Sequence, residues 1–213
     1  MAFDDRLKFS ALCAAAFACA LASSVARSAD GATGLDHVVP LDDRGIWARG
    51  NQKALLTAML VGEAGAAVWE GGETRLGRAM WQSIDATVVG GVAAETLKLT
   101  FSRSRPDQTS DPNRWFQGRG NESFPSGEVT VTAAIVTPLV LEYASDHPAV
   151  ALLELLPVYD AIARVKVHGH WQSDVIAGLA LGTGVGYLVH RHAGSPWILR
   201  VMPHGIYVGV RTH

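Results

Sequence analysis

The sequence predicts an all-α fold, a single-domain bundle of about five to six helices. Two observations carry this prediction. The chain has 213 residues, of which 48% are hydrophobic, and this is enough for one domain with its own core. Apolar residues recur at helical spacing, and glycine and proline divide the chain into segments of helical length. We find no internal repeat and no second domain in this pattern.

Residues 1–29 have the pattern of a secretory signal peptide. Arg6 and Lys8 give a basic start, residues 10–26 are uncharged and rich in alanine, and small residues follow at the candidate cleavage positions. Both cysteines of the chain, Cys13 and Cys19, lie inside this segment. We therefore expect an exported protein of the periplasm or cell envelope. An uncleaved membrane anchor is the alternative, which the short apolar stretch disfavours.

The rest of the chain divides into an arm, a helical domain and a tail. Residues 30–50 are rich in glycine and aspartate and predict an N-terminal arm or linker. The helical domain is expected at 51–194, and the tail at 195–213. The expected helices cover residues 51–69, 74–101, 126–145, 148–165 and 170–192. A polar loop at 102–124 follows the second helix, because a residue before proline avoids helical geometry. The tail is expected to hold a helical piece near Trp197 and an alternating run, 206–210, that is a short strand or an ordered tail.

Charge and hydropathy exclude some classes of function. The net charge of −2 makes a nucleic-acid partner improbable. After the signal, no run of eighteen uncharged apolar residues predicts a membrane-spanning helix. Residues 175–189 are apolar, but four glycines predict a buried helix that packs closely against its neighbours. These glycines are Gly178, Gly182, Gly184 and Gly186.

The first fragment that carries chemistry contains Lys98 and Arg105-Pro106. Seven residues make two turns of helix, so one helix face would present both cations. Arginine offers a planar fork for two oxygens, and lysine is a movable point charge. The alternative is a solvated basic helix end, to which Arg103 also contributes.

The second fragment, Pro125-Ser126-Gly127-Glu128, lies where the loop is expected to meet the third helix. Free amides at a helix start favour an anion, and Ser126 adds a hydroxyl donor. Gly127 lets the backbone approach an oxygen closely. The alternative is a simple helix start, with Ser126 as the N-cap and Glu128 in the first turn.

The third fragment contains Arg164, His170 and Asp174. His170 and Asp174 are four residues apart, so they share a face if both are helical. A carboxylate behind an imidazole fixes its tautomer and stabilises the positive charge that develops when the other nitrogen attacks. The alternative is a surface histidine–aspartate pair of little energetic value.

Together, the three fragments supply three cations, a hydroxyl, a backbone amide and an imidazole. A phosphoryl group requires such a set, because the charge on its three equatorial oxygens must be met by pre-placed donors. We therefore predict that the helical bundle surrounds a phosphate pocket.

On these residues the chain resembles the phosphatidic acid phosphatase type 2 and vanadium haloperoxidase superfamily, over roughly residues 75–192. The string from His170 to Asp174 is similar to that of soluble, exported acid phosphatases in this superfamily. The resemblance implies a metal-independent phosphatase without a cofactor, in which His170 forms a phosphohistidine and Asp174 orients it. The residues implied to hold the phosphate are Lys98, Arg105, Ser126, Gly127 and Arg164.

The sequence departs from the family pattern at two positions. Ala163 replaces a serine, and Glu128 replaces the histidine that donates a proton to the leaving oxygen. We expect Glu128 to be catalytic if burial and the adjacent phosphate raise its pKa. Two alternatives remain: His168 supplies the proton, or protonation is dispensable, which favours a good leaving group such as a diphosphate.

The expected substrate is a phosphomonoester or diphosphate, and the favoured substrate class is a phosphorylated lipid. This rests on the export signal, the apolar composition and the loop aromatics Trp115 and Phe116, which are alternatively anchors in the core. Peripheral membrane contact is a further expectation. The rival functions are a vanadium-dependent haloperoxidase and a phosphate- or lipid-binding protein in which Glu128 has weakened catalysis.

Overall fold

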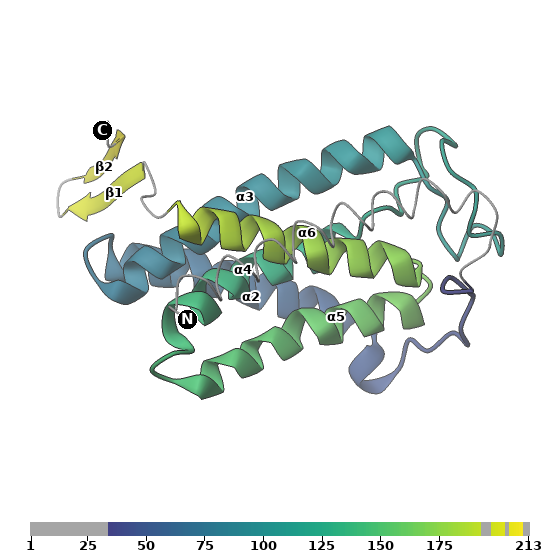
Figure 1. Cartoon of the computed structure of the whole chain (residues 1–213), viewed down its shortest axis with the longest axis horizontal. Coiled ribbons are helices and arrows are strands. Elements are labelled where there is room, and N and C mark those ends of the chain that lie inside the picture. Colours follow the sequence, from purple (N-terminus) through teal and green to yellow (C-terminus); the bar gives the residue numbers. More distant parts are fainter. Residues whose placement is uncertain (1–33, 193–196, 203–204, 211–213) are drawn as a thin grey trace, which may run out of the picture.

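The computed structural model describes residues 34–192, 197–202 and 205–210. The α-helices of this part are α2 (Arg49–Glu70), α3 (Arg75–Phe101), α4 (Gly127–Tyr143), α5 (Leu155–Lys166) and α6 (Gln172–Arg191). Two short 3₁₀ helices, η1 (Gly45–Trp47) and η2 (Pro148–Glu154), lie before α2 and before α5. The bundle in Figure 1 confirms the all-α prediction. Four of the five predicted helices agree with the observed ones to within two residues at each end. The predicted signal peptide lies outside the described residues.

Helix α4 lies at the centre of the bundle, and small residues let its neighbours approach it closely. Where the backbones of two helices touch, no space is left for a side chain between them, so glycine is needed on one of the helices. A Cβ at Gly182 of α6 would lie 2.2 Å from the carbonyl oxygen of Thr130, and one at Gly186 would lie 2.8 Å from Thr137 Cβ. The close packing predicted for α6 is thus confirmed at these positions. Gly184 instead faces open space.

Two predicted elements differ in the structure. The helix expected at 148–165 divides into η2 and α5, because Pro157 has no amide to donate and its ring would clash with the carbonyl four residues earlier. The helical piece expected near Trp197 is wrong. Residues Trp197–Met202 form strand β1, which pairs antiparallel with β2 (Gly205–Val210). The alternating run of the tail is therefore a strand, and the hairpin lies at the end of the bundle opposite the long loop (Figure 1).

The segment before α2 runs as an extended arm over the junction of α5 and α6. The amide of Asp42 donates to the carbonyl of Lys166 at 3.0 Å, and that of His37 donates to Gln172 Oε1 at 3.1 Å. These contacts fix residues 34–48 beside the start of α6. Among the described residues, none of the helices combines the length and the apolar composition that crossing a membrane requires.

Candidate active site

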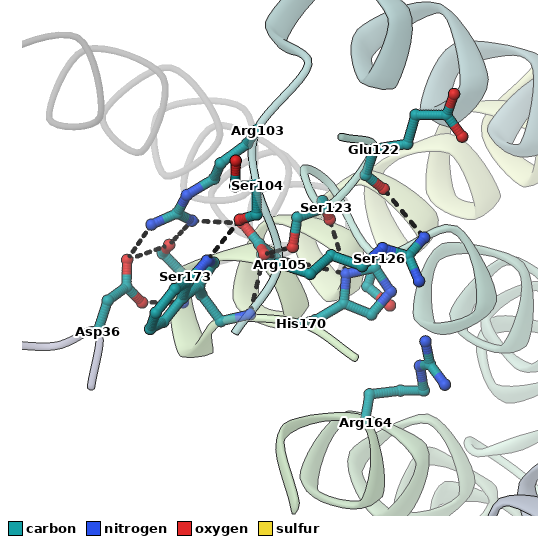
Figure 2. A network of polar contacts seen from close by, with 12 residues as sticks. Asp36, Arg103, Ser104, Arg105, Glu122, Ser123, Ser126, Arg164, His170 and Ser173 are labelled. Carbon is teal, nitrogen blue, oxygen red and sulfur yellow. Dashed lines mark hydrogen bonds and ion pairs between the residues drawn. The ribbon is translucent and has the colours of Figure 1, made fainter. Parts of the chain in front are cut away.

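Four side chains from separate parts of the chain point toward one another at one end of the bundle. Arg105 comes from the loop after α3, Ser126 from the start of α4, Arg164 from the end of α5, and His170 from the turn before α6 (Figure 2). The exposed fraction is 0% for Ser126, 4% for Arg164 and 3% for His170. Ser126 Oγ and Arg164 Nε are buried without a hydrogen-bond partner among the described residues. Buried donors are nearly always satisfied, so these two are available to a ligand.

Two glycines make room for cations at this site. A Cβ at Gly127 would lie 2.8 Å from Lys98 Nζ, and one at Gly169 would lie 2.5 Å from Arg164 Nη2. The absence of a side chain at position 127 therefore lets Lys98 lie over the first turn of α4. Gly169 has the same effect for Arg164. Lys98 also donates to Glu95 Oε1 at 2.5 Å.

Lys98 and Arg105 do not share a helix face, contrary to the expectation from their spacing. Helix α3 ends at Phe101, because Ser102 adopts a left-handed backbone conformation with φ of 39°. Arg105 lies in the following loop, where its Nη2 donates to the carbonyl of Glu122 at 3.3 Å. Both cations still lie near enough to affect the titration of His170.

The His170 imidazole is oriented by a backbone carbonyl. Its Nδ1 lies 2.7 Å from the carbonyl oxygen of Ser123, an acceptor, so Nδ1 carries the proton and Nε2 keeps its lone pair. Burial, followed by the charges of Arg164 and Arg105, holds the pKa of His170 well below its usual value. The ring is therefore a neutral imidazole with a free nucleophilic nitrogen.

Asp174 supports this arrangement indirectly, through Ser123. Its Oδ2 lies 3.9 Å from His170 Nδ1, and it accepts hydrogen bonds from Ser123 Oγ at 2.5 Å and from the amide of Trp171 at 2.9 Å. The carboxylate expected behind the imidazole is thus connected to it by hydrogen bonds through Ser123. Burial raises the pKa of Asp174, although the charge of Arg103 and these hydrogen bonds act in the opposite direction.

Arg103 holds Asp174 from the other side and is not part of a solvated helix end. Its exposed fraction is 2%, and its Nη1 donates to Asp174 Oδ1 and, at 2.8 Å, to Ser173 Oγ. Its Nη2 donates to Asp36 Oδ2 of the arm at 2.7 Å, as Figure 2 shows. The sequence reasoning missed Asp36 and Ser123, and treated Arg103 as accessory. Only its position two residues before Arg105 hinted at a role.

Glu128 forms a fork-to-fork ion pair with Arg49 of α2. Arg49 Nη1 donates to Glu128 Oε2 at 2.6 Å, and Nη2 donates to Oε1. Burial alone would raise the pKa of Glu128, but the hydrogen bond from Arg49 and the nearby positive charges outweigh burial and lower it. The expectation of a raised pKa is therefore wrong for this structure, and Glu128 is a carboxylate.

The alternative proton donor, His168, is bound to the N-terminal arm. Its Nε2 lies 2.7 Å from the carbonyl oxygen of Val39, so this nitrogen is occupied by the arm. The simple helix-start alternative is correct in position, with Glu128 in the first turn of α4. Ser126 is the N-cap of α4, yet its side chain makes no capping hydrogen bond.

Three further polar residues near the site, of which Gln52 and Asp160 are buried, were not anticipated. Gln52 is fully buried, and its Oε1 accepts from Arg49 Nη1 at 3.1 Å and from Arg164 Nη1 at 3.5 Å. Asp160 lies one helical turn before Arg164 with an exposed fraction of 2%, and burial raises its pKa to about 7. Arg49 is the third. Only Asp160 could have been anticipated, from its i,i+4 spacing to Arg164. Nothing in the sequence indicates that α2, which carries Arg49 and Gln52, lies at this site.

The two aromatic residues of the long loop have different surroundings. The ring of Trp115 packs against Phe124 with centroids 5.3 Å apart, and Arg103 lies over it at 4.3 Å. Trp115 is thus the anchor of the loop. Phe116 has an exposed fraction of 70%. Within the described ranges, His, Cys, Asp and Glu residues form no group of three or more that could hold a metal ion.

Comparison with known proteins agrees with this geometry. Residues 79–195 match the model of the PAP2 superfamily. The chain belongs to the PAP2 superfamily. The three site fragments all lie within the matched residues, whereas Arg49 and Asp36 precede them.

Three curated proteins are similar to this PAP2 superfamily chain. The lipid A 1-phosphatase of Rhizobium etli is 35% identical over 100 residues, which make up 45% of this chain and 42% of that protein. The lipid A 1-phosphatase of Rhizobium johnstonii is also 35% identical over 100 residues and is covered to 40%. That of Porphyromonas gingivalis is 34% identical over 107 residues, 22% of its length. The chain thus spans less than half the length of these relatives. No solved structure matches it.

Proposed function

We propose that this protein is a phosphatase that removes a phosphoryl group from a phosphorylated lipid through a phosphohistidine at His170. The observation that carries the proposal is the group of three cations and one hydroxyl around a neutral imidazole, in which Arg164 and Ser126 are buried. Two of these donors, Ser126 Oγ and Arg164 Nε, have no hydrogen-bond partner among the described residues. Membership of the PAP2 superfamily supports the same reaction class.

The proposed chemistry uses residues in place of a metal ion. His170 Nε2 attacks phosphorus, while Arg105, Arg164 and Lys98 neutralise the charge that develops on the equatorial oxygens. Ser126 Oγ and the amide of Gly127 complete the set of donors. Asp174 acts through Ser123, whose carbonyl fixes the imidazole tautomer. Fixed cations provide the charge stabilisation that magnesium gives in other phosphoryl-transfer enzymes.

A lipid is the favoured substrate class for two reasons. The similar proteins of Rhizobium and Porphyromonas are named lipid A 1-phosphatases. The exposed ring of Phe116, on the loop that carries Arg105, offers an apolar contact for the rest of such a substrate. Export to the periplasm or cell envelope, with peripheral membrane contact, is part of the proposal.

Trapping of the covalent intermediate tests the proposed function. The purified protein is incubated with p-nitrophenyl phosphate, phosphatidate or an isoprenoid diphosphate and quenched, and acid-labile phosphate on the protein is measured. We expect label in the wild type and in His147→Ala, which changes an exposed histidine in a remote turn, and none in His170→Ala. Label that persists in His170→Ala would identify another nucleophile. Tight phosphate binding without turnover of any ester would favour the alternative of a binding protein.

A further inference from the structure

Arg49 contributes a cation to the site from outside the three sequence fragments. It opens α2, upstream of the residues that match the PAP2 superfamily. Both of its terminal nitrogens bind the carboxylate of Glu128. The buried amide of Gln52 accepts from both Arg49 and Arg164, so one side chain holds the two guanidinium groups as neighbours. Helix α2 thus places a guanidinium group, ion-paired with Glu128, next to that of Arg164.

The carboxylate of Glu128 lies between these two arginines. Its Oε2 is 2.6 Å from Arg49 Nη1 and 4.0 Å from Arg164 Nε. A phosphoryl group bound by Arg164 and Ser126 therefore has Arg49 as its next cationic neighbour on that side. A second phosphate attached to the first would lie next to Arg49, in the region that the carboxylate of Glu128 also occupies. Planar bidentate arginine is well suited to such a phosphate oxygen pair.

The same ion pair removes Glu128, which stands at the position of the family's proton donor, as an acid for the leaving group. Glu128 is ionised, and His168 is bound to the carbonyl of Val39. An alkoxide leaving group needs a proton, because an alcohol is about as weak an acid as water. A phosphate monoester has a second pKa of about 6 and leaves without a proton at neutral pH.

Resting on the proposed function, we propose that Arg49 and Glu128 make this site selective for phosphoanhydrides, with Arg49 binding the phosphate that leaves. In the first step, the Nε2 lone pair of His170 forms a bond to the terminal phosphorus. The bridging P–O bond breaks, and its electron pair departs with the phosphate monoester, whose charge Arg49 neutralises. No proton is transferred in this step.

The second step needs a base, and an ionised Glu128 is suited to that role. Water attacks the phosphorus of the phosphohistidine, and the P–N bond breaks with its electron pair returning to His170. Glu128 accepts the proton that the water loses and later releases it to solvent. The products are the phosphate monoester and inorganic phosphate. An ionised carboxylate at position 128 is thus compatible with both steps for an anhydride, but not with the first step for an alkyl ester.

Three substrates separate the two features of the proposal. Farnesyl diphosphate has a good leaving group that carries a second phosphate. p-Nitrophenyl phosphate has a good leaving group without one, and farnesyl monophosphate has neither feature. We expect the wild-type kcat/KM to be highest for the diphosphate and lowest for the monophosphate. Arg49→Gln should lower kcat/KM for the diphosphate about 10–100-fold more than for p-nitrophenyl phosphate, the usual effect of losing one charged hydrogen bond.

Further variants keep the test decisive if Arg49→Gln does not fold. Arg49→Lys retains the charge without the planar fork, and should reduce diphosphate turnover less than Arg49→Gln. Lys53→Gln removes an exposed charge from the same helix and should change none of the three rates. Glu128→His supplies a titratable acid and should raise turnover of farnesyl monophosphate relative to the diphosphate.

Each contrary outcome has a defined meaning. Equal wild-type turnover of the farnesyl monophosphate and diphosphate would overturn the anhydride selectivity while leaving the proposed phosphatase function intact. An equal loss for diphosphate and p-nitrophenyl phosphate in Arg49→Gln would show that Arg49 merely positions Glu128, and would overturn its role in binding. Absence of turnover and of phosphohistidine with all three substrates would overturn the proposed function, and this inference with it.

Discussion

Glu63 is a buried carboxyl group far in sequence from the site fragments, and it makes the stability of the protein depend on pH. It lies on α2 with an exposed fraction of 5%, and its Oε1 accepts a hydrogen bond from Thr87 Oγ1 at 3.1 Å. Burial raises its pKa from 4.5 to about 7, although the hydrogen bond from Thr87 opposes this rise. Between these limits the folded state keeps the proton that the unfolded state has lost. The free energy of unfolding therefore falls as the pH rises.

The magnitude follows from the width of this pH window. Roughly 2.5 pH units at about 1.4 kcal/mol each give a loss of about 3 kcal/mol between pH 4.5 and pH 7. Glu63→Gln keeps an oxygen that accepts from Thr87 but cannot ionise. We expect this variant to be close to the wild type at pH 4.5, or somewhat less stable. It should then gain up to about 3 kcal/mol relative to the wild type by pH 7, with no further gain above it.

Urea unfolding at a series of pH values measures this difference. The difference in unfolding free energy between Glu63→Gln and the wild type is plotted from pH 4.5 to pH 8.5. Asp107→Asn, which removes a carboxylate from an exposed loop position, controls for the loss of one negative charge. A difference that stays constant across the range would refute the reasoning, because it would mean that Glu63 titrates alike in the folded and unfolded states.

Four other predictions follow from the packing and the site. Gly182→Ala should destabilise the protein by about 1–3 kcal/mol in thermal or urea unfolding, because the new Cβ would lie 2.2 Å from the carbonyl oxygen of Thr130. Gly184→Ala, which meets open space on the same helix, should instead stabilise it by up to about 1 kcal/mol. In the pH profile of kcat/KM, activity should persist below pH 6.5, the ordinary pKa of histidine, because burial and the adjacent arginines oppose protonation of His170. A loss of activity at or above pH 6.5 that is assigned to His170 would contradict this. Asp36→Asn should cost about 1–3 kcal/mol in unfolding free energy, because it weakens the contacts between the arm and α6; an unchanged unfolding midpoint would show that the arm adds nothing there.

The sequence was sufficient for most helix boundaries, because these depend on local chemistry. Thr74 caps α3 through its side chain, which accepts from the amide of Gly77. The α3 boundary lies within one residue of the predicted position at each end. The tail could not be predicted in the same way. Trp197 lies in a strand because a second strand pairs with it, and pairing between segments is not visible in the local pattern.

The site was only partly predictable for the same reason. The sequence supplied His170, Arg164, Arg105 and Ser126 from three fragments, and the structure brings these side chains together. Spacing suggested that Asp174 lies behind the imidazole and orients it. The fold instead uses the carbonyl of Ser123, which lies 47 residues away in the chain. A backbone acceptor has no sequence signature, so this contact could not have been inferred.

By itself, the sequence determined which residue types are available and where the helices begin and end, since capping, proline geometry and apolar spacing act over a few residues. The tertiary structure decided their protonation states. Glu128 is ionised because α2 brings Arg49 against it, and His170 is neutral because the bundle buries it beside two arginines. Charge depends on desolvation and on neighbours in space, and both are set when distant segments pack together.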